Sequence, residues 1–253
     1  MLPDRAAPSH SARTAVVWDV LRNAVSAAVG DRSGGLELLD VLDVGGGTGG
    51  FAVPLALLGH RVTVVDPNPD ALAALQRRAR EADVQVRAVQ GDAAGLLDVV
   101  AAGSADLVLC HGVLEHVEDV GPAVRALVEV LRPGGTLSVL AASRNAVVLA
   151  RAVAGRFTEA RHALDDPDGR WGPGDPLPRR FTESGLAQVL SAAGLRMGGV
   201  HGVRTVADLV PGGLVDSEPG AAEALVDLER ATANLPEFRA VATQLHVLAT
   251  RTT

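Results

Sequence analysis

The sequence predicts an α/β protein with a Rossmann-like, doubly wound, mostly parallel sheet. Short runs rich in Val and Leu alternate with longer amphipathic segments, and a glycine-rich loop follows the first of these runs. Each short run is apolar almost throughout, as in strands that helices cover on both faces. Strands that alternate with helices in this way form a parallel sheet.

The expected elements follow one another in regular order. The segment 70–82 is typical of the helices: Leu72, Leu75 and Ala79 recur at helical spacing, and Asp70, which follows Pro69, is the expected N-cap. We expect strands at 38–44, 61–65, 85–90, 105–110, 136–141, 195–204 and 244–249. We expect helices at 50–58, 70–82, 93–102, 121–131, 182–193 and 221–233.

Composition excludes several classes of function. The formal net charge is −7, so we expect no large basic surface for nucleic acid or anionic membranes. Aromatic residues make up 2% of the chain, which leaves few side chains to stack on RNA bases. Cys110 is the single cysteine, which excludes an internal disulfide, and the histidine spacing suggests no metal site. With no apolar run long enough to span a membrane, we expect a cytoplasmic protein without membrane contact.

The glycine loop at 45–50 indicates a ligand site. Gly45, Gly47 and Gly50 satisfy G-x-G-x-x-G between a strand and a helix, where the turn is tight and a ligand approaches the backbone closely. Asp66 ends the second strand, where a carboxylate can accept hydrogen bonds from ribose hydroxyls. The loop alone therefore predicts an adenosine-like ligand and fits a nicotinamide dinucleotide as well.

Three further features distinguish a nicotinamide dinucleotide from another adenosine-containing cofactor. Asp43 stands just before the loop, placed either to receive an ammonium group or to tie down the loop amides. Asp92 follows the third strand, where it could meet the adenine amine or act as a helix N-cap. The stretches 106–116 and 131–135 complete a series that resembles the class I S-adenosylmethionine-dependent methyltransferases. A nicotinamide enzyme would need a second nucleotide half, of which the chain shows no sign.

A closer resemblance covers nearly the whole chain. The segments 13–18, 155–157, 178–179, 202–204 and 245–250 are similar to the bacterial tRNA 5-carboxymethoxyuridine methyltransferases. That resemblance implies S-adenosylmethionine as cofactor, tRNA as partner and methylation of a wobble-uridine carboxylate. Together with the loop motif, it implies a cofactor site made of Arg13, Asp43, Gly45, Gly46, Gly47, Asp66, Asp92, Ala93 and His111.

The chain departs from that family at two places. Residues 6–10, Ala-Ala-Pro-Ser-His, replace aromatic and lysine residues, and Asp165, Asp166 and Asp168 stand where a lysine-rich patch is expected. Lost cations weaken the phosphate contacts that supply most non-specific RNA affinity. A methyltransferase of a small-molecule acid therefore stays open, as does a non-catalytic binding module.

The expected chemistry follows from a carboxylate as the acceptor of the methyl group. It is ionised at neutral pH, with a pKa of about 4, so catalysis reduces to holding one oxygen in line with the methyl group. Arginine binds carboxylates in bidentate fashion, and we expect Arg144, Arg179 or Arg204 to orient the substrate, with Arg144 best placed. His111 is the candidate base for a phenol, hydroxyl or amine, although a cofactor-orienting role is preferred.

We expect one methyltransferase domain over residues 1–253. Its parts are an N-terminal helical lid at 1–35, a cofactor-binding core at 36–142, a substrate-side insertion after the fifth strand at 143–180, and the C-terminal part of the sheet at 181–253. The insertion begins with a short helical piece and is otherwise expected to be irregular, because turn-forming residues crowd 165–169 and 171–176.

Overall fold

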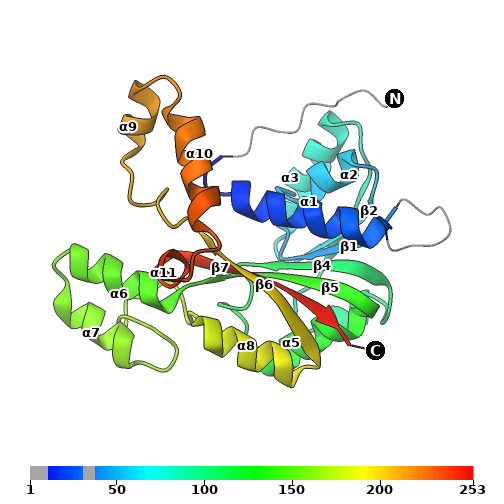
Figure 1. Ribbon diagram of the computed structural model, residues 1–253. Coiled ribbons are helices and arrows are strands. Elements are labelled where there is room, and N and C mark those ends of the chain that lie inside the picture. Colours follow the sequence, from blue (N-terminus) through cyan, green and yellow to red (C-terminus); the bar gives the residue numbers. More distant parts are fainter. Residues whose placement is uncertain (1–10, 31–37, 253) are drawn as a thin grey trace.

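The computed structural model describes residues 11–30 and 38–252. A seven-stranded sheet lies between two layers of helices (Figure 1). The strands are β1 (Asp40–Val44), β2 (Arg61–Asp66), β3 (Val86–Gln90), β4 (Ala105–His111), β5 (Leu131–Ala142), β6 (Leu195–Val203) and β7 (Gln244–Arg251). The helices are α1 (Ala15–Gly30), α2 (Ala52–Leu57), α3 (Pro69–Glu81), α4 (Leu96–Val99), α5 (Val120–Val130), α6 (Arg144–Val153), α7 (Phe157–Asp165), α8 (Glu183–Ala192), α9 (Gly212–Ser217), α10 (Ala221–Thr232) and α11 (Pro236–Arg239).

The strand order is β3-β2-β1-β4-β5-β7-β6. Strands β1 to β5 pair in parallel, and β7 runs antiparallel between β5 and β6. The order reverses between β1 and β4, and in doubly wound sheets the crevice outside the carboxyl ends at such a point binds the ligand. The predicted fold class is thereby confirmed.

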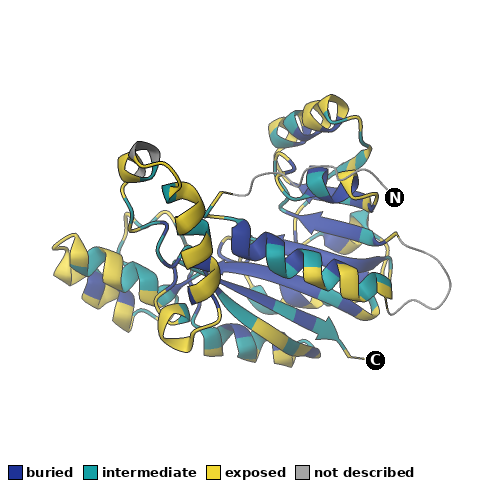
Figure 2. Ribbon diagram, turned by 45° about the horizontal axis from the view of Figure 1, so that its top comes forward, coloured by how far each residue is buried: buried dark blue, intermediate teal, exposed yellow. Residues whose placement is uncertain are grey.

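Two apolar clusters fix the layers on either side of the sheet. One joins α1, α2 and α3 to the sheet and includes Val17, Leu21 and Leu75. The other joins α5 and α8 to the opposite face, through residues such as Leu127 and Leu186. In Figure 2 the central strands are dark blue, whereas α6, α7, α9 and α10 are largely teal and yellow. The rigid core is thus the sheet with its two helix layers.

Helix α3 begins earlier than predicted. Asn68, not Asp70, is the N-cap: its side-chain oxygen accepts from the amides of Asp70 at 2.9 Å and Ala71 at 3.4 Å. Pro69 then takes the first helical position, where its missing N–H costs nothing. The expectation for Asp70 was wrong because both residues are good caps and only the backbone path chooses between them.

Two other predicted segments differ from the structure. The helix expected at 93–102 shrinks to α4, because Asp92 accepts from the amides of Ala94 and Gly95 and holds a turn there. In the insertion, α6 and α7 make its first half helical rather than irregular. Gly155, at φ 72°, lies in the turn between them. Residues 166–180 hold neither helix nor strand, as expected.

Candidate functional site

A cavity of about 970 Å³ opens at the carboxyl ends of the strands around the switch point. Four of the predicted cofactor residues line it: Gly45, Asp66, Asp92 and Ala93. The rest of its wall comes mainly from the segment after β4 and the start of α5. The fold therefore brings these separate segments to one crevice, where we expect the ligand.

The glycine loop has no room for side chains at Gly45 and Gly46. A Cβ on Gly45 would lie 2.3 Å from Val113 Cγ2, and one on Gly46 would lie 2.5 Å from Asp43 Oδ2. Gly45 and Gly47 also adopt positive φ values of 71° and 53°, which side chains disfavour. Both the conformation and the close approach of the backbone thus require glycine here.

Asp66, at the end of β2, connects this strand to the glycine loop that follows β1. Its Oδ2 accepts from the Gly47 amide and its Oδ1 from the Asn68 amide, each at 2.9 Å. Each carboxylate oxygen keeps a second lone pair that ribose hydroxyls could use. Asp66 therefore holds the loop in place while it lines the cavity.

Asp43 lies beneath the loop and is 2% exposed. Its Oδ2 has no hydrogen-bond partner in the described part of the chain. Burial, and secondarily the charge of Asp66, raise the pKa of the Asp43 carboxyl to about 7. A buried carboxylate with an unpaired oxygen fits a site that gains a cation or a donor when a ligand binds.

Asp92 was predicted to contact adenine or to act as a helix N-cap, and the structure shows it capping a turn instead of a helix. Its Oδ1 accepts from the amides of Ala94 at 3.0 Å and Gly95 at 2.8 Å, so it caps the turn ahead of α4, whose own N-cap is Gly95. Asp92 also lines the cavity. The contact with adenine stays a prediction.

His111 ends β4 beside aromatic side chains from two other elements. Its ring meets Phe51 edge-on at 4.8 Å between centroids, and Phe51 lies 5.0 Å from Trp18 of α1. Burial lowers the pKa of His111 to about 3, so the imidazole is neutral at physiological pH. Neighbouring Glu115 accepts from the Ala142 amide at 2.6 Å and thereby ties the segment after β4 to the end of β5.

Arg144 and Arg179 are both engaged by the protein itself. Arg144 donates to the carbonyls of Ala163, at 3.2 Å, and Leu164 at the end of α7. Arg179 donates to the carbonyl of Val117 at 2.8 Å and pairs with Asp168. Arg144 thus holds the insertion together, and only Arg179 touches a segment that lines the cavity.

Arg13 and Arg204 meet at one carboxylate. Arg204 donates to Asp208 at 2.9 Å, and Arg13 Nε lies 3.7 Å from the same side chain. Arg204 has the positive φ of 59°, which is rare for a side-chain-bearing residue. The structure therefore joins a residue predicted to bind cofactor to one predicted to bind substrate. Their roles stay predictions.

Several residues at the site were not predicted to belong to it. Val113 and His116, which line the cavity, lie in the stretch 106–116, but no site role was expected for them, and Phe51, which packs against His111, had no signal in the sequence. Ser138 Oγ lies 2.8 Å from His111 Nε2. Ser138 stands mid-strand on β5, so only the register of β4 and β5 brings it to His111.

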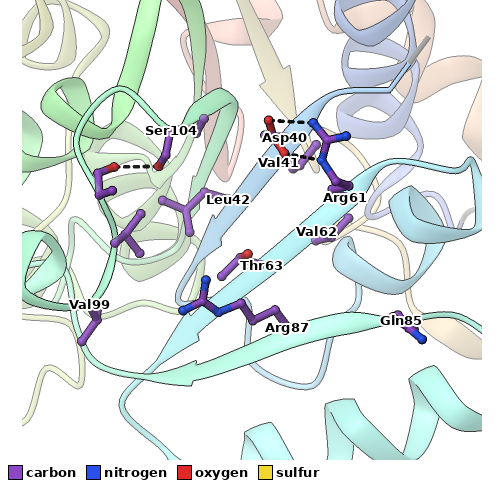
Figure 3. A pocket seen from close by; sticks show the side chains of 13 residues that line it. Asp40, Val41, Leu42, Arg61, Val62, Thr63, Gln85, Arg87, Val99 and Ser104 are labelled. Atoms are coloured by element: carbon purple, nitrogen blue, oxygen red, sulfur yellow. Dashed lines mark hydrogen bonds and ion pairs between the residues drawn. The ribbon is translucent and has the colours of Figure 1, made fainter. Parts of the chain in front are cut away.

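A second cavity, of about 640 Å³, lies at the amino ends of β1 to β4. Arg61 and Asp40, at the amino ends of β2 and β1, pair with each other on its wall at 2.6 Å (Figure 3). Within residues 11–30 and 38–252, no three His, Cys, Asp or Glu side chains could hold a metal ion. In the same ranges, no helix is long and apolar enough to cross a membrane.

Comparison with known sequences agrees with this geometry. Residues 42–139 match the methyltransferase domain family. A tRNA 5-carboxymethoxyuridine methyltransferase of Escherichia coli O157:H7 is 29% identical over 242 residues, 94% of this chain and 87% of its own. A ubiquinone biosynthesis O-methyltransferase of Azorhizobium caulinodans is 35% identical over 170 residues, and the match spans 66% of this chain and 63% of that protein.

Solved structures share the fold. Magnesium protoporphyrin IX methyltransferase from Synechocystis, solved with bound S-adenosylhomocysteine, matches with a TM-score of 0.60 at 17% identity over 95% of this chain and 86% of its own. A [4+2]-cyclase matches with the same TM-score of 0.60 at 21% identity over 93% and 82%. The fold alone therefore does not fix the reaction. Residues 42–139 thus belong to the methyltransferase domain family, and the chain has the fold of class I S-adenosylmethionine-dependent methyltransferases.

Proposed function

We propose that the protein transfers a methyl group from S-adenosylmethionine to a carboxylate oxygen, and that 5-carboxymethoxyuridine in tRNA carries this carboxylate. The state of His111 is the observation that carries the acceptor class. With its pKa lowered to about 3, this imidazole is a weak base at neutral pH, which favours an acceptor that is already ionised. The similarity to the tRNA enzyme over 94% of the chain supports the particular acceptor.

The residues around the cavity fit the proposed cofactor. S-adenosylmethionine supplies an electrophilic methyl group on a sulfonium ion. Asp66 would bind the ribose hydroxyls, Asp92 and Ala93 the adenine, and the unpaired oxygen of Asp43 would receive the positive end of the methionine moiety, directly or through the loop amides. Arg13 would face the cofactor carboxylate.

No proton has to be removed in this reaction. A carboxylate oxygen forms a bond to the methyl carbon as the carbon–sulfur bond breaks, and its electron pair goes to the neutral thioether. The protein has only to exclude water and hold the oxygen in line. Arg204 and Arg179 are the candidates to hold it: Arg204 donates two hydrogen bonds to Asp208, and Arg179 donates to Val117 on the cavity wall.

A methyltransferase of a small-molecule acid is the second candidate. Cations on the insertion are neutralised by neighbouring acids, which leaves little positive charge for an RNA backbone. The pairs are Arg151–Glu159, Arg161–Asp165 and Arg170–Asp166. The similarity to a ubiquinone biosynthesis O-methyltransferase supports a small-molecule acceptor.

Calorimetric titration with S-adenosylmethionine tests the cofactor. We expect binding to the wild type and its loss in Asp66→Ala. Asp70→Ala is the matched control, because it removes a nearby exposed carboxylate of α3 and should bind normally. Absence of binding to the wild type would remove every form of this proposal.

Mass spectrometry of wobble nucleosides tests the acceptor. In tRNA from a deletion strain, the methyl ester of 5-carboxymethoxyuridine should disappear and the free acid accumulate. Purified wild-type protein with S-adenosylmethionine should restore the ester on that tRNA, and Asp66→Ala should not. An unchanged ester level in the deletion strain excludes the tRNA and leaves the small-molecule acid.

A further inference from the structure

A chain of polar side chains crosses the sheet from the site toward its antiparallel edge. Ser138 Oγ lies 2.8 Å from His111 Nε2 and 2.8 Å from His246 Nε2. The three residues stand on β4, β5 and β7, which are neighbours in the sheet (Figure 1). Ser138 and His246 are both 0% exposed. Nothing in the cofactor loop requires this chain of contacts.

Two arrangements of hydrogens satisfy both bonds and also give the serine hydrogen an acceptor. Burial lowers the pKa of His111 and of His246, so each ring is neutral and carries one N–H. If both rings donated to Ser138, its own hydrogen would have no hydrogen-bond acceptor among the contacts of the described residues, so we take Ser138 to accept from one ring and donate to the other. The ring that receives the serine hydrogen carries its own hydrogen on Nδ1.

The two arrangements differ in where that Nδ1–H lies. Within the described part of the chain, the Nδ1 atoms of His111 and His246 lack hydrogen-bond partners, as does that of His201, whose ring is 5.8 Å from His246. On His246, which is 0% exposed, the N–H would be an unpaired donor inside the protein, which is costly. On His111, whose Nδ1 is also buried, a ligand bound at the carboxyl end of β4, beside the cavity-lining Gly112, could supply the acceptor.

We propose that Ser138 and His246 are positioning residues that hold His111 as the Nδ1–H tautomer, a neutral hydrogen-bond donor for an oxygen atom of the bound ligand. His246 donates to Ser138, and Ser138 donates to His111. Nδ1 of His111 then carries the hydrogen, and the lone pair of Nε2 accepts from Ser138, so no free lone pair is left to take up a proton from the ligand. This inference rests on the proposed function for the identity of the ligand. It adds that the methyl acceptor has to arrive deprotonated.

Nitrogen-15 spectra of the full-length protein, labelled at its seven histidines, test the tautomers directly. Signals are assigned by their loss in His111→Gln and His246→Gln. Without cofactor, we expect His111 to be protonated at Nδ1 and bare at Nε2, and His246 to show the reverse. A His111 protonated at Nε2 overturns the proposal. This result does not depend on any methylation assay, so it fails or holds separately from the proposed function.

Two substitutions separate positioning from packing. His246→Gln keeps an amide N–H near the position of Nε2, whereas His246→Leu removes the donor. We expect the glutamine variant to keep the His111 tautomer and to bind S-adenosylhomocysteine within about twofold of the wild type. The leucine variant should show mixed tautomers and roughly tenfold weaker binding. Equal losses in both would contradict the proposal. If His246→Leu does not fold, Ser138→Ala against Ser138→Thr makes the same comparison.

Discussion

Gly46 lies directly over the carboxylate of Asp43, so closely that a Cβ at this position would fall 2.5 Å from Oδ2. We expect Gly46→Ala to displace the loop and weaken the binding of S-adenosylhomocysteine by more than tenfold in calorimetric titration. Gly50→Ala is the matched control. Gly50 belongs to the same G-x-G-x-x-G pattern, yet no atom lies within 4 Å of its would-be Cβ. Similar losses in both variants would mean that glycine flexibility, not this contact, matters.

The buried Asp43 carboxyl makes stability depend on pH. Its pKa of about 7 in the folded protein exceeds the ordinary value of 3.8, so the folded state keeps a proton that the unfolded chain releases between these values. The free energy of unfolding therefore falls as pH rises from about 4 to about 7, by up to roughly 4 kcal/mol. Asp43→Asn should remove this slope.

Urea denaturation of the wild type and Asp43→Asn across this pH range measures the effect. Asp70→Asn, on the exposed first turn of α3, controls for the loss of a carboxyl group. Asp43→Asn should also be more stable than the wild type at neutral pH, because it removes the cost of burying a charged carboxylate and, secondarily, its repulsion from Asp66. Parallel pH profiles for all three proteins would show that Asp43 is ionised throughout.

The second half of the insertion is anchored by a buried ion pair. Arg180 donates to both oxygens of Asp175, at 2.6 and 2.8 Å, and the two side chains are only 7% and 1% exposed. Arg180→Gln would leave the Asp175 carboxylate buried without its cation, and we expect a loss of about 3–5 kcal/mol in the free energy of unfolding.

An ion pair with a half-exposed arginine in the same segment provides the comparison. Arg170→Gln breaks the contact with Asp166, whose side chain is 9% exposed while that of the arginine is 50% exposed, and should cost less than Arg180→Gln because solvent reaches this pair. Chemical denaturation of the two variants tests this difference. If Arg180→Gln costs no more than Arg170→Gln, the buried pair does not anchor the insertion.

Glu229 holds the loop that carries Arg204. This fully buried carboxylate on α10 accepts from the amides of Thr205 at 3.1 Å, and of Val206 and Ala207 at 2.7 Å each. Glu229→Gln replaces one acceptor oxygen with a donor, so we expect a loss of about 1–3 kcal/mol. Hydrogen exchange at the three amides should become faster.

The same helix contains the control for this substitution. Glu223→Gln, in the exposed first turn of α10, should leave both stability and exchange unchanged. If Arg204 binds the acceptor, Glu229→Gln should also raise the Michaelis constant for the acceptor more than it lowers turnover. Unchanged exchange at residues 205–207 would contradict the anchoring role.

Local pattern was enough to predict most of the fold. The apolar runs locate all seven strands, although β5 begins at Leu131 and not at the predicted residue 136. The central strands, which are buried on both faces, leave the most continuous signal. Helix starts were less certain: Asn68 and Asp70 are both good caps, and the choice depends on the path that leaves β2. The α6–α7 hairpin was masked by the turn-forming residues that follow it.

The site, like the fold, could be predicted from the sequence only in part. Gly45, Asp66 and Asp92 follow strand ends, and the topology of the sheet brings those ends together, so the motif located them. The surroundings of Arg204 depend on Asp208 and Arg13, which meet only in the folded chain. The contact of Ser138 with His246 depends on strand register. Such pairings leave no trace in spacing along the chain.

The contact of Trp18 with Phe51 has a practical consequence. The chain contains two tryptophans and no tyrosine, so its intrinsic fluorescence comes from these two side chains. Trp18 lies in the first helix, 5.0 Å from a ring that touches His111. Trp171 lies in the insertion, stacked under Arg151 at 3.9 Å. In Trp171→Phe, the remaining fluorophore would report events at the crevice without any attached dye, in real time.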